Sequence, residues 1–403
     1  MQEYVKGKPI FTNINKVIKQ YPYLTNNIQT DVLIVGGGVT GAICSYYFTK
    51  NNIKTVLMEK SRVGHLSTSV TTSLLQYELD DNALELKEVM ELEKVIRAYE
   101  LGLYALDEIE KFTMKYGNNF DYIKRDTLLY TNKDTEKKAM KNEFEIRKEN
   151  GFDVEYIDGD INPYSFSLKA GVLSKSGGAE IDPYKFTHEL LRVGTEKGLK
   201  VYENTEAIKI QYNDEFVEVE TTYGYKVKAK KVIVATGYNT DLFTHRKFAT
   251  KSNTFNIATK PIKDDIGLKN NILIRDNEDP YNYLRTTKDN RIIIGGEDVD
   301  FTEIENEKLA MKKYDILEQR LKHMFNHLKD MEIEYKYCGC FASTKDNLGF
   351  IGPDPKHKNL WYCLGYGANG ILFAILGGLI LSDLYNGKKS KDIDLFKVDR
   401  FDN

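Results

Sequence analysis

The clearest pattern of hydrophobic and polar positions lies near the start of the chain. An apolar run at 31–35 ends in three glycines at 36–38, small residues continue over 39–51, and a second apolar run fills 54–58. Short apolar runs bounded by turn residues are typical of buried parallel strands. The order strand, glycine turn, helix and strand predicts a βαβ unit.

Helical patterns follow at several places. Apolar residues recur at helical spacing over 83–112, which predicts one long amphipathic helix or a broken pair. Segment 133–150 is almost wholly charged and is followed by Gly151, so it predicts a solvated outer helix. Segment 303–325 predicts another helix, and 371–381 predicts a buried apolar one.

Strand patterns fill most of the rest. Segment 201–235 alternates and predicts β-structure with a turn at 223–224. A hairpin is predicted from 281–285 to 291–295, and a last strand at 360–364. Residues 1–30 predict an ordered arm with aromatic anchors, in which Pro22 prevents a regular helix. Apolar strands followed by glycine-rich turns lie near both ends of the chain, with β-rich sequence between them, and this arrangement predicts two interleaved domains.

Composition narrows the class of protein. The 403 residues carry 57 Lys and Arg against 60 Asp and Glu, a net charge of −3, which argues against nucleic acid as the main partner. Four cysteines are too few for a disulfide framework, so a reducing compartment is expected. The apolar run at 371–381 is shorter than the roughly 20 residues of a transmembrane helix. No apolar signal segment is evident, and a cytoplasmic location is expected.

The glycine turn has the spacing of a dinucleotide fingerprint. Gly36, Gly38 and Gly41 follow a strand and open a helix, and Glu59 ends the next strand. The glycines permit a tight turn and close approach to a pyrophosphate, which the helix N-terminus attracts, while Glu59 can accept ribose hydroxyl protons. An ordinary glycine-rich turn in an α/β protein is the alternative.

Three further segments favour FAD over NAD. Residues 67–73 contain six hydroxyl side chains, 231–237 is a strand running into a small-residue turn, and 365–370 is glycine-rich and precedes the apolar helix. Each alone is a weak signal. Together they indicate a cofactor that extends through the protein and is contacted at four remote places.

The motifs resemble the FAD-dependent amine and amino-acid oxidoreductases of the D-amino-acid oxidase type. The resemblance extends from residue 31 to about 383 and depends on DVLIVGGGVTGA, LMEK, TTSLLQYELD, GAEIDPYKFTHEL, VIVATG, YLRTTKDNRIIIGGED, GCFASTKDNLGFIGPD and GYGANGI. TTSLLQYELD and STKD most resemble the γ-glutamylputrescine oxidoreductase-like branch. The resemblance implies an α/β flavoprotein fold of the glutathione-reductase type, in which a Rossmann-like FAD-binding domain is interleaved with a mixed-sheet substrate domain.

The implied domains are an arm at 1–30, an FAD-binding domain at 31–82, 151–240 and 338–395, and a substrate-binding, partly helical domain at 83–150 and 241–337. The implied contacts to a noncovalent FAD are Gly36, Gly38, Val39, Thr40, Gly41, Glu59, Lys60, Thr68, Thr71, Thr72, Ser73, Leu74, Ala207, Ala235, Thr236, Gly237, Gly367, Asn369, Gly370 and Ile371.

The chain departs from the family at three positions near the substrate and the flavin. Phe341 and Ala368 stand where amino-acid oxidases and glycine oxidase have arginines, the first of which clamps the substrate carboxylate. Ile293 aligns with the lysine that promotes oxygen reduction in sarcosine oxidase. These departures argue against a simple α-amino acid held in the usual way and against rapid use of oxygen.

The candidate substrate pocket contains Tyr281, Tyr283, Arg285, Glu297, Phe341 and Tyr366. The tyrosines suit an aromatic cage around an amine. Arg285 and Glu297 bracket the hairpin and are candidates to pair with charged ends of a substrate, although pairing with other side chains is the alternative. No catalytic group is assigned.

No metal site is expected, because Cys338 and Cys340 lack a second ligand pair, and His323 and His327 lack a third ligand. The resemblance implies hydride transfer from the carbon beside an amine nitrogen to FAD, giving an imine from a small-molecule amine or N-substituted amino acid. The electron acceptor, oxygen or another carrier, is left open. The alternatives are oxidation of a hydroxyl, as in glycerol-phosphate-type enzymes, and a non-catalytic FAD-binding protein.

Overall fold

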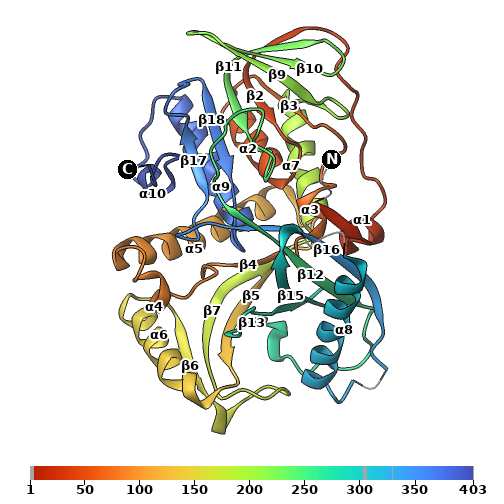
Figure 1. Cartoon of the computed structure of the whole chain (residues 1–403), viewed down its shortest axis with the longest axis vertical. Helices are drawn as coiled ribbons and strands as arrows, with labels where there is room; N and C mark the ends of the chain where they lie inside the picture. The colour runs from red at the N-terminus through yellow and green to blue at the C-terminus, as the bar shows by residue number, and fades with distance from the viewer. Residues whose placement is uncertain (1–3, 303–305, 329, 403) are drawn as a thin grey trace.

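The computed structural model describes residues 4–302, 306–328 and 330–402, and within them two β-sheets form the framework (Figure 1). The smaller sheet has five parallel strands in the order β18-β11-β2-β3-β8. Its eight strands are β2 (Ile28–Val35), β3 (Thr55–Met58), β8 (Lys200–Tyr202), β9 (Ala207–Tyr212), β10 (Val217–Thr221), β11 (Lys226–Val234), β17 (Phe350–Pro353) and β18 (Leu360–Leu364).

Strand β2 lies between β3 and β11, so the direction of winding reverses beside it. Ligands of such sheets bind at the carboxyl ends of the strands where the order reverses. The glycine turn after β2 and the turn after β11 therefore meet at one edge of the sheet, although 200 residues separate Gly36 from Thr236.

The helices of the chain are α1 (Ile10–Ile14), α2 (Val39–Lys50), α3 (Ser67–Val70), α4 (Ala83–Leu86), α5 (Leu92–Tyr116), α6 (Lys137–Glu149), α7 (Pro183–Glu196), α8 (Glu307–Met324), α9 (Gly370–Tyr385) and α10 (Ile393–Phe396), with 3-10 turns at Asp134–Glu136, Gly159–Ile161 and Lys269–Asn271. No helix in the described ranges is long and apolar enough to span a membrane.

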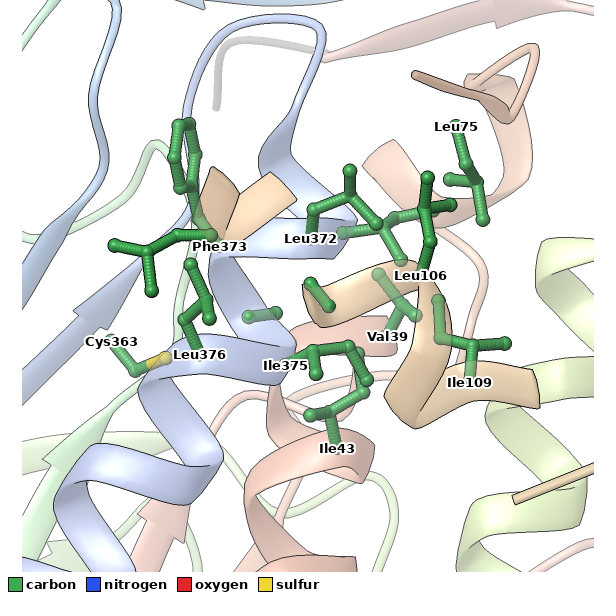
Figure 2. Close-up of a cluster of buried hydrophobic side chains, with 14 of the residues drawn as sticks. Val39, Ile43, Leu75, Leu106, Ile109, Cys363, Leu372, Phe373, Ile375 and Leu376 are labelled. Carbon is green, nitrogen blue, oxygen red and sulfur yellow. The ribbon is translucent and has the colours of Figure 1, made fainter. Parts of the chain in front are cut away.

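The parallel sheet is covered on both faces. Val32 and Ile34 point into a core with α2, α7 and α9, whereas Leu33 and Val35 point toward β10 on the other face. Helix α2 packs against both α7 and α9, and Figure 2 shows side chains of α2, α5 and α9 meeting in this core. Burial on every side explains why α2 and α9 consist of apolar and small residues.

The larger sheet has the order β1-β16-β12-β15-β14-β13-β5-β7-β4, with β6 on β7. Its strands are β1 (Val5–Gly7), β4 (Leu74–Gln76), β5 (Ile123–Thr131), β6 (Val154–Asp158), β7 (Ala170–Glu180), β12 (Thr250–Thr259), β13 (Leu273–Asp276), β14 (Tyr283–Thr286), β15 (Ile292–Asp300) and β16 (Ile333–Ser343). Helix α8 covers β12, β15 and β16 and forms a second core with them.

The N-terminal arm spans both sheets. Strand β1 pairs with β16 of the larger sheet. Farther along, the Tyr21 N–H donates to Glu203 at 2.9 Å and the Leu24 N–H donates to Thr205 at 3.1 Å, beside the smaller sheet. Pro22 lies in this extended part, and the last residues of the predicted arm already belong to β2.

The predicted mixed α/β fold with its Rossmann-like unit is confirmed. The helical pattern over 83–112 corresponds to the broken pair α4 and α5, the hairpin corresponds to β14 and β15, and the helix predicted from 303 corresponds to α8, its first residues lying outside the described ranges. The helix at 133–150 is not wholly solvated, because Glu143 and Arg147 on α6 are buried.

The predicted domain boundaries stay a prediction, because pairing within a sheet does not by itself delimit a domain. Strands β4, β6, β7 and most of β16 fall inside the ranges predicted for FAD binding, yet they pair in the larger sheet. The chain therefore passes between the two sheets more often than the predicted ranges imply.

Candidate functional site

One large cavity is lined by both sheets at the carboxyl ends of β2 and β11. It contains about 1940 Å³ of empty space, open solvent at its mouth included. Four remote segments contribute to its wall: the turn after β2, the segment around α3, the turn after β11, and the loop before α9. A cavity whose wall comes from four such places fits a dinucleotide that extends through the protein.

The turn after β2 is unusually compact. A Cβ added to Gly41 would lie 1.8 Å from the carbonyl oxygen of Gly36, so only glycine permits this contact between helix and turn. Gly38, Val39 and Thr40 at the start of α2 line the cavity. The partial positive charge of that helix end favours a phosphate group there.

Glu59 follows β3 and lines the same end of the cavity. Its carboxylate accepts the Gly37 N–H at 2.7 Å and the Ser61 N–H at 2.8 Å, one on each oxygen. Each oxygen keeps a lone pair that can accept a ribose hydroxyl proton. Burial raises the pKa of the Glu59 carboxyl above its ordinary value, and the two N–H donors oppose that shift.

The basic side chains of Lys60, Arg62 and His65 also line the cavity beside Glu59. They complement an anionic ligand at this end.

At the turn after β11, the buried hydroxyl of Thr236 has no hydrogen-bond partner within the described part of the chain. Since a buried polar group normally has a partner, this hydroxyl fits a polar ligand in the cavity.

The hydroxyl-rich segment forms α3 and the residues that lead into β4. Thr68 accepts the Val39 N–H at 2.9 Å and so joins this segment to the first turn of α2. Thr71, Thr72 and Leu74 line the cavity, whereas Ser73 does not. The segment is thus a partly helical wall of the site.

The loop before α9 closes the other end. Gly367, Gly370 and Ile371 line the cavity. Asn369 does not; its side-chain amide donates to the carbonyl oxygen of Gln76 at 2.7 Å and fixes the loop against β4. The N-terminus of α9 therefore lies at the cavity, where its dipole favours negative charge.

Most of the predicted cofactor contacts are brought together by the fold. The cavity is lined by Gly36, Gly38, Val39, Thr40, Glu59, Lys60, Thr68, Thr71, Thr72, Leu74, Ala207, Ala235, Thr236, Gly237, Gly367, Gly370 and Ile371. Gly41, Ser73 and Asn369 lie behind this wall. The residues present thus fit FAD: a phosphate-binding helix start, a ribose-binding carboxylate and a second helix dipole at the far end.

Among the predicted substrate residues, Tyr281, Tyr283 and Phe341 line the cavity. Tyr283 belongs to β14, and its ring fills the space where a side chain on Gly295 would stand, since an added Cβ would lie 2.4 Å from it. The hydroxyl of Tyr281 donates to Asp80 at 2.9 Å. Two tyrosines and a phenylalanine therefore form an aromatic part of the wall.

The other three predicted substrate residues do not line the cavity. Arg285 is buried and donates to the backbone carbonyls of Thr72 at 2.5 Å and Ile181 at 2.8 Å. It therefore connects β14 to the segments that contain these two carbonyls. Glu297 pairs with Lys313 at 3.0 Å and with Arg320.

Tyr366 turns its hydroxyl to the Gly237 carbonyl at 3.0 Å. It is therefore engaged with the backbone of the second nucleotide turn, behind the cavity wall.

Sequence reasoning missed several residues of the wall, including Tyr4, Gln76, Thr254, Arg275 and Cys340. Arg275 is on β13 and faces Tyr283 across the pair β13–β14. Its four-residue strand, with the sequence LIRD, carries no local motif, so the only signal is its place next to the predicted hairpin.

Comparison with known proteins agrees with this site. The model of the family described as FAD dependent oxidoreductase matches residues 31–384. A putative Rieske 2Fe-2S iron-sulfur protein of Bacillus subtilis is 24% identical over 99% of this chain and 77% of its own length. Glycine oxidase of the same organism is 23% identical, covering 92% and 97%. Gamma-glutamylputrescine oxidoreductase of Escherichia coli is 25% identical, covering 90% and 85%.

Solved structures share the fold. Glycine oxidase from Geobacillus kaustophilus superposes with a TM-score of 0.77 at 19% identity, covering 92% of this chain and 98% of that one. L-alpha-glycerophosphate oxidase from Mycoplasma pneumoniae with FAD bound gives 0.73 at 19% identity, covering 90% and 97%. With the nucleotide turns, the ribose carboxylate and the family match over most of its length, the chain belongs to the family of FAD-dependent oxidoreductases that its motifs predicted.

Proposed function

We propose that this protein oxidises the C–N bond of a small amine or N-substituted amino acid, with FAD as the electron acceptor of the chemical step. The observation that carries the proposal is one continuous cavity. It is lined at one end by the nucleotide turn with Glu59, and at the other by Tyr281, Tyr283 and Phe341. When bound, FAD supplies hydride acceptance from the carbon beside the nitrogen, and the resulting imine hydrolyses in water.

The residues of the chain bind the substrate and orient it toward the flavin. Aromatic rings at the substrate end exclude water and suit an amine, which they contact through their faces. The N-terminus of α9 at that end favours negative charge. No side chain is proposed as a general base, because a neutral amine needs none. The relatives named for glycine and for gamma-glutamylputrescine support an amine as the substrate class.

We propose that FAD is held without a covalent bond. Cys340 is the cysteine that lines the cavity, and burial raises the pKa of its thiol to about 12. A thiol with that pKa is almost wholly protonated at neutral pH and is a poor nucleophile.

The electron acceptor that reoxidises the flavin is proposed to be a carrier other than oxygen. The position that matches the oxygen-activating lysine is Ile293, which is buried in an apolar cluster with Phe11, Val70 and Tyr337. A dye-linked rate well above the oxygen-linked rate is expected; equal rates would contradict this part.

Purified protein tests the proposal directly. Acid precipitation should leave a yellow supernatant, and a yellow pellet would contradict noncovalent binding. Anaerobic mixing with glycine, N-methylglycine and N-acylated diamines should bleach the flavin band with at least one of them, whereas glycerol 3-phosphate should not. Bleaching by the alcohol alone would show oxidation of a hydroxyl, and no bleaching by any compound would favour a binding protein without turnover.

A further inference from the structure

Arg275 is a buried cation on the cavity wall that makes no direct salt bridge within the described residues, although the Asp80 carboxylate attracts it over a longer distance. Its side chain is 6% exposed and lines the cavity. Its Nη1 atom donates to the backbone carbonyl oxygens of Leu79, at 2.8 Å, and Asp80. Within the described residues no carboxylate oxygen lies within 4.0 Å of its guanidinium, and Nε and Nη2 have no protein partner.

The other buried arginines differ in this respect. Arg147 contacts Glu143 and Glu78, and Arg291 contacts Asp289 and Glu334. Arg285 lies 3.9 Å from Glu180 and does not line the cavity. Buried charges in proteins are normally paired, because an unpaired one loses its hydration without compensation. Among the described residues, Arg275 is thus the buried guanidinium with no carboxylate in direct contact, and only the longer-range attraction of Asp80 offsets its charge.

The surroundings hold this guanidinium in one place. Arg275 and Tyr283 are directly opposite each other on β13 and β14, and opposite residues of an antiparallel pair point to the same face. The ring centroid of Tyr281 is 5.6 Å from the Arg275 guanidinium carbon. With the two carbonyl contacts, the free edge of the guanidinium is pre-organised beside the aromatic end of the cavity.

We propose that Arg275 binds a carboxylate of the substrate through Nε and Nη2. This inference depends on the proposed amine oxidation and specifies its substrate as a carboxylated amine, either an amino acid or an N-carboxyalkyl amine. Two parallel N–H donors match the two oxygens of a carboxylate. Phe341 cannot play this role, and the charge is supplied from a different strand of the same sheet.

The charges of the wall support an anionic group at this end. The acidic residues lining the cavity are Glu59 and Glu206, which belong to the nucleotide end of the wall. The nearby carboxylate of Asp80 already accepts the Ala368 N–H at 3.1 Å and the Tyr281 hydroxyl. Among the residues that line the cavity, Arg275 is the charged one beside Tyr281 and Tyr283, and a cation there favours an anionic group. The buried carboxylates of Asp80 and Asp298 also act on these two tyrosines, but neither lines the cavity.

Binding of a simple carboxylate to the FAD-loaded protein provides the first test. Propionate should perturb the visible flavin spectrum with a saturable titration, and neutral propionamide should not. The Arg275→Gln variant keeps N–H donors for the Leu79 and Asp80 carbonyls but removes the charge. We expect its affinity for propionate to fall about 100-fold, and Arg275→Lys to retain part of it.

Substrate preference provides the second test. N-methylglycine and N-methylethylamine share the methylamine group, and only the first carries a carboxylate. In anaerobic reduction the wild-type protein should prefer N-methylglycine by at least about tenfold, and Arg275→Gln should lose this preference mainly through a raised KM. Arg291→Gln, which alters a buried arginine that does not line the cavity, should keep the preference.

The outcomes separate the inference from the proposed function. Equal reduction by both amines, or equal losses for both in Arg275→Gln, would overturn the role of Arg275 while leaving amine oxidation in place. If neither amine bleaches the flavin, the proposed function loses support, and the propionate titration still decides whether Arg275 binds carboxylates. Should Arg275→Gln lose its FAD, the propionate-against-propionamide comparison in the wild-type protein decides, and equal binding of the two overturns the inference.

Discussion

At the scale of single residues, the cofactor turn depends on contacts that leave no room for a side chain. Gly41 is the sharpest case, because its α-carbon packs against the Gly36 carbonyl. We expect Gly41→Ala to open the turn, lower the free energy of unfolding by about 3 kcal/mol and abolish FAD retention. Flavin content after gel filtration and urea denaturation measure the two effects.

Gly198 is the matched control for this substitution. It has a φ of +91° and nothing within 4 Å of an added Cβ, and it lies beyond the exposed end of α7. Gly198→Ala should cost about 1 kcal/mol from backbone strain alone and leave flavin content unchanged. If both variants lost FAD equally, the close approach at Gly41 would not be the cause.

Residues of the site were predictable where their signal is local. Gly36, Gly38 and Glu59 stand at fixed offsets around one strand and one helix, and the fold brings them to one cavity end. Arg275 and Asp80 were not predictable, because 195 residues separate the guanidinium from the carbonyl that it contacts. Arg285 and Glu297 do not line the cavity, because a position around a predicted hairpin does not reveal which side chains border a cavity formed by two sheets.

At the scale of elements, a buried ion cluster connects α6 to the start of α4. Arg147 donates to Glu143 at 2.6 Å and to Glu78 at 2.8 Å, and Glu143 also accepts the Leu84 N–H at 2.9 Å. Glu78 is followed directly by Leu79 and Asp80, whose carbonyls contact Arg275. The cluster therefore positions the segment that contacts Arg275 on the cavity wall.

Removing the cation should leave two buried carboxylates unpaired. We expect Arg147→Met to lower the free energy of unfolding by about 3–5 kcal/mol and the melting temperature by roughly 5 °C or more. Lys148→Met, one residue along the same helix at an exposed position, should change stability by less than about 0.5 kcal/mol. Similar melting temperatures for the two variants would show that the cluster contributes no net stability.

The same cluster explains the limit of element prediction. The charged pattern of 137–149 is typical of a solvated helix, and its helical character was correctly predicted. The burial of this helix was not predicted, because Glu78, the partner of Arg147, is 69 residues away in the sequence. By contrast, β2, α2 and β3 were predictable together with their pairing, since the glycine turn and the apolar runs specify a unit within thirty residues.

At the scale of the whole molecule, segments that cross between the sheets shape the cavity. The arm pairs with β16 through β1 and places Tyr4 on the wall. Arg285 of the larger sheet holds the Thr72 carbonyl beside α3. Because both sheets supply the wall, we expect the cavity to form only when the sheets are docked, so global stability bears directly on ligand binding.

One buried histidine makes that global stability depend on pH. Burial, assisted by repulsion from His65, lowers the pKa of His188 from 6.5 to about 4, and neither ring nitrogen has a partner among the described residues. Between pH 6.5 and 4, His188 is therefore protonated in the unfolded chain and neutral in the folded chain. The stability associated with neutral His188 is fully present above pH 6.5 and is lost as the pH falls toward 4. Between pH 7.5 and 4.5 this loss is about 2.5 kcal/mol.

His188→Phe keeps an aromatic ring against Tyr184 and should remove that part of the pH dependence, measured by urea denaturation at both pH values. Carboxyls whose pKa burial raises, such as Asp298 at about 6, act in the opposite direction in both proteins and cancel in the comparison. The exposed His323→Phe variant should keep the wild-type dependence, and the same slope in all three proteins would contradict the assignment to His188.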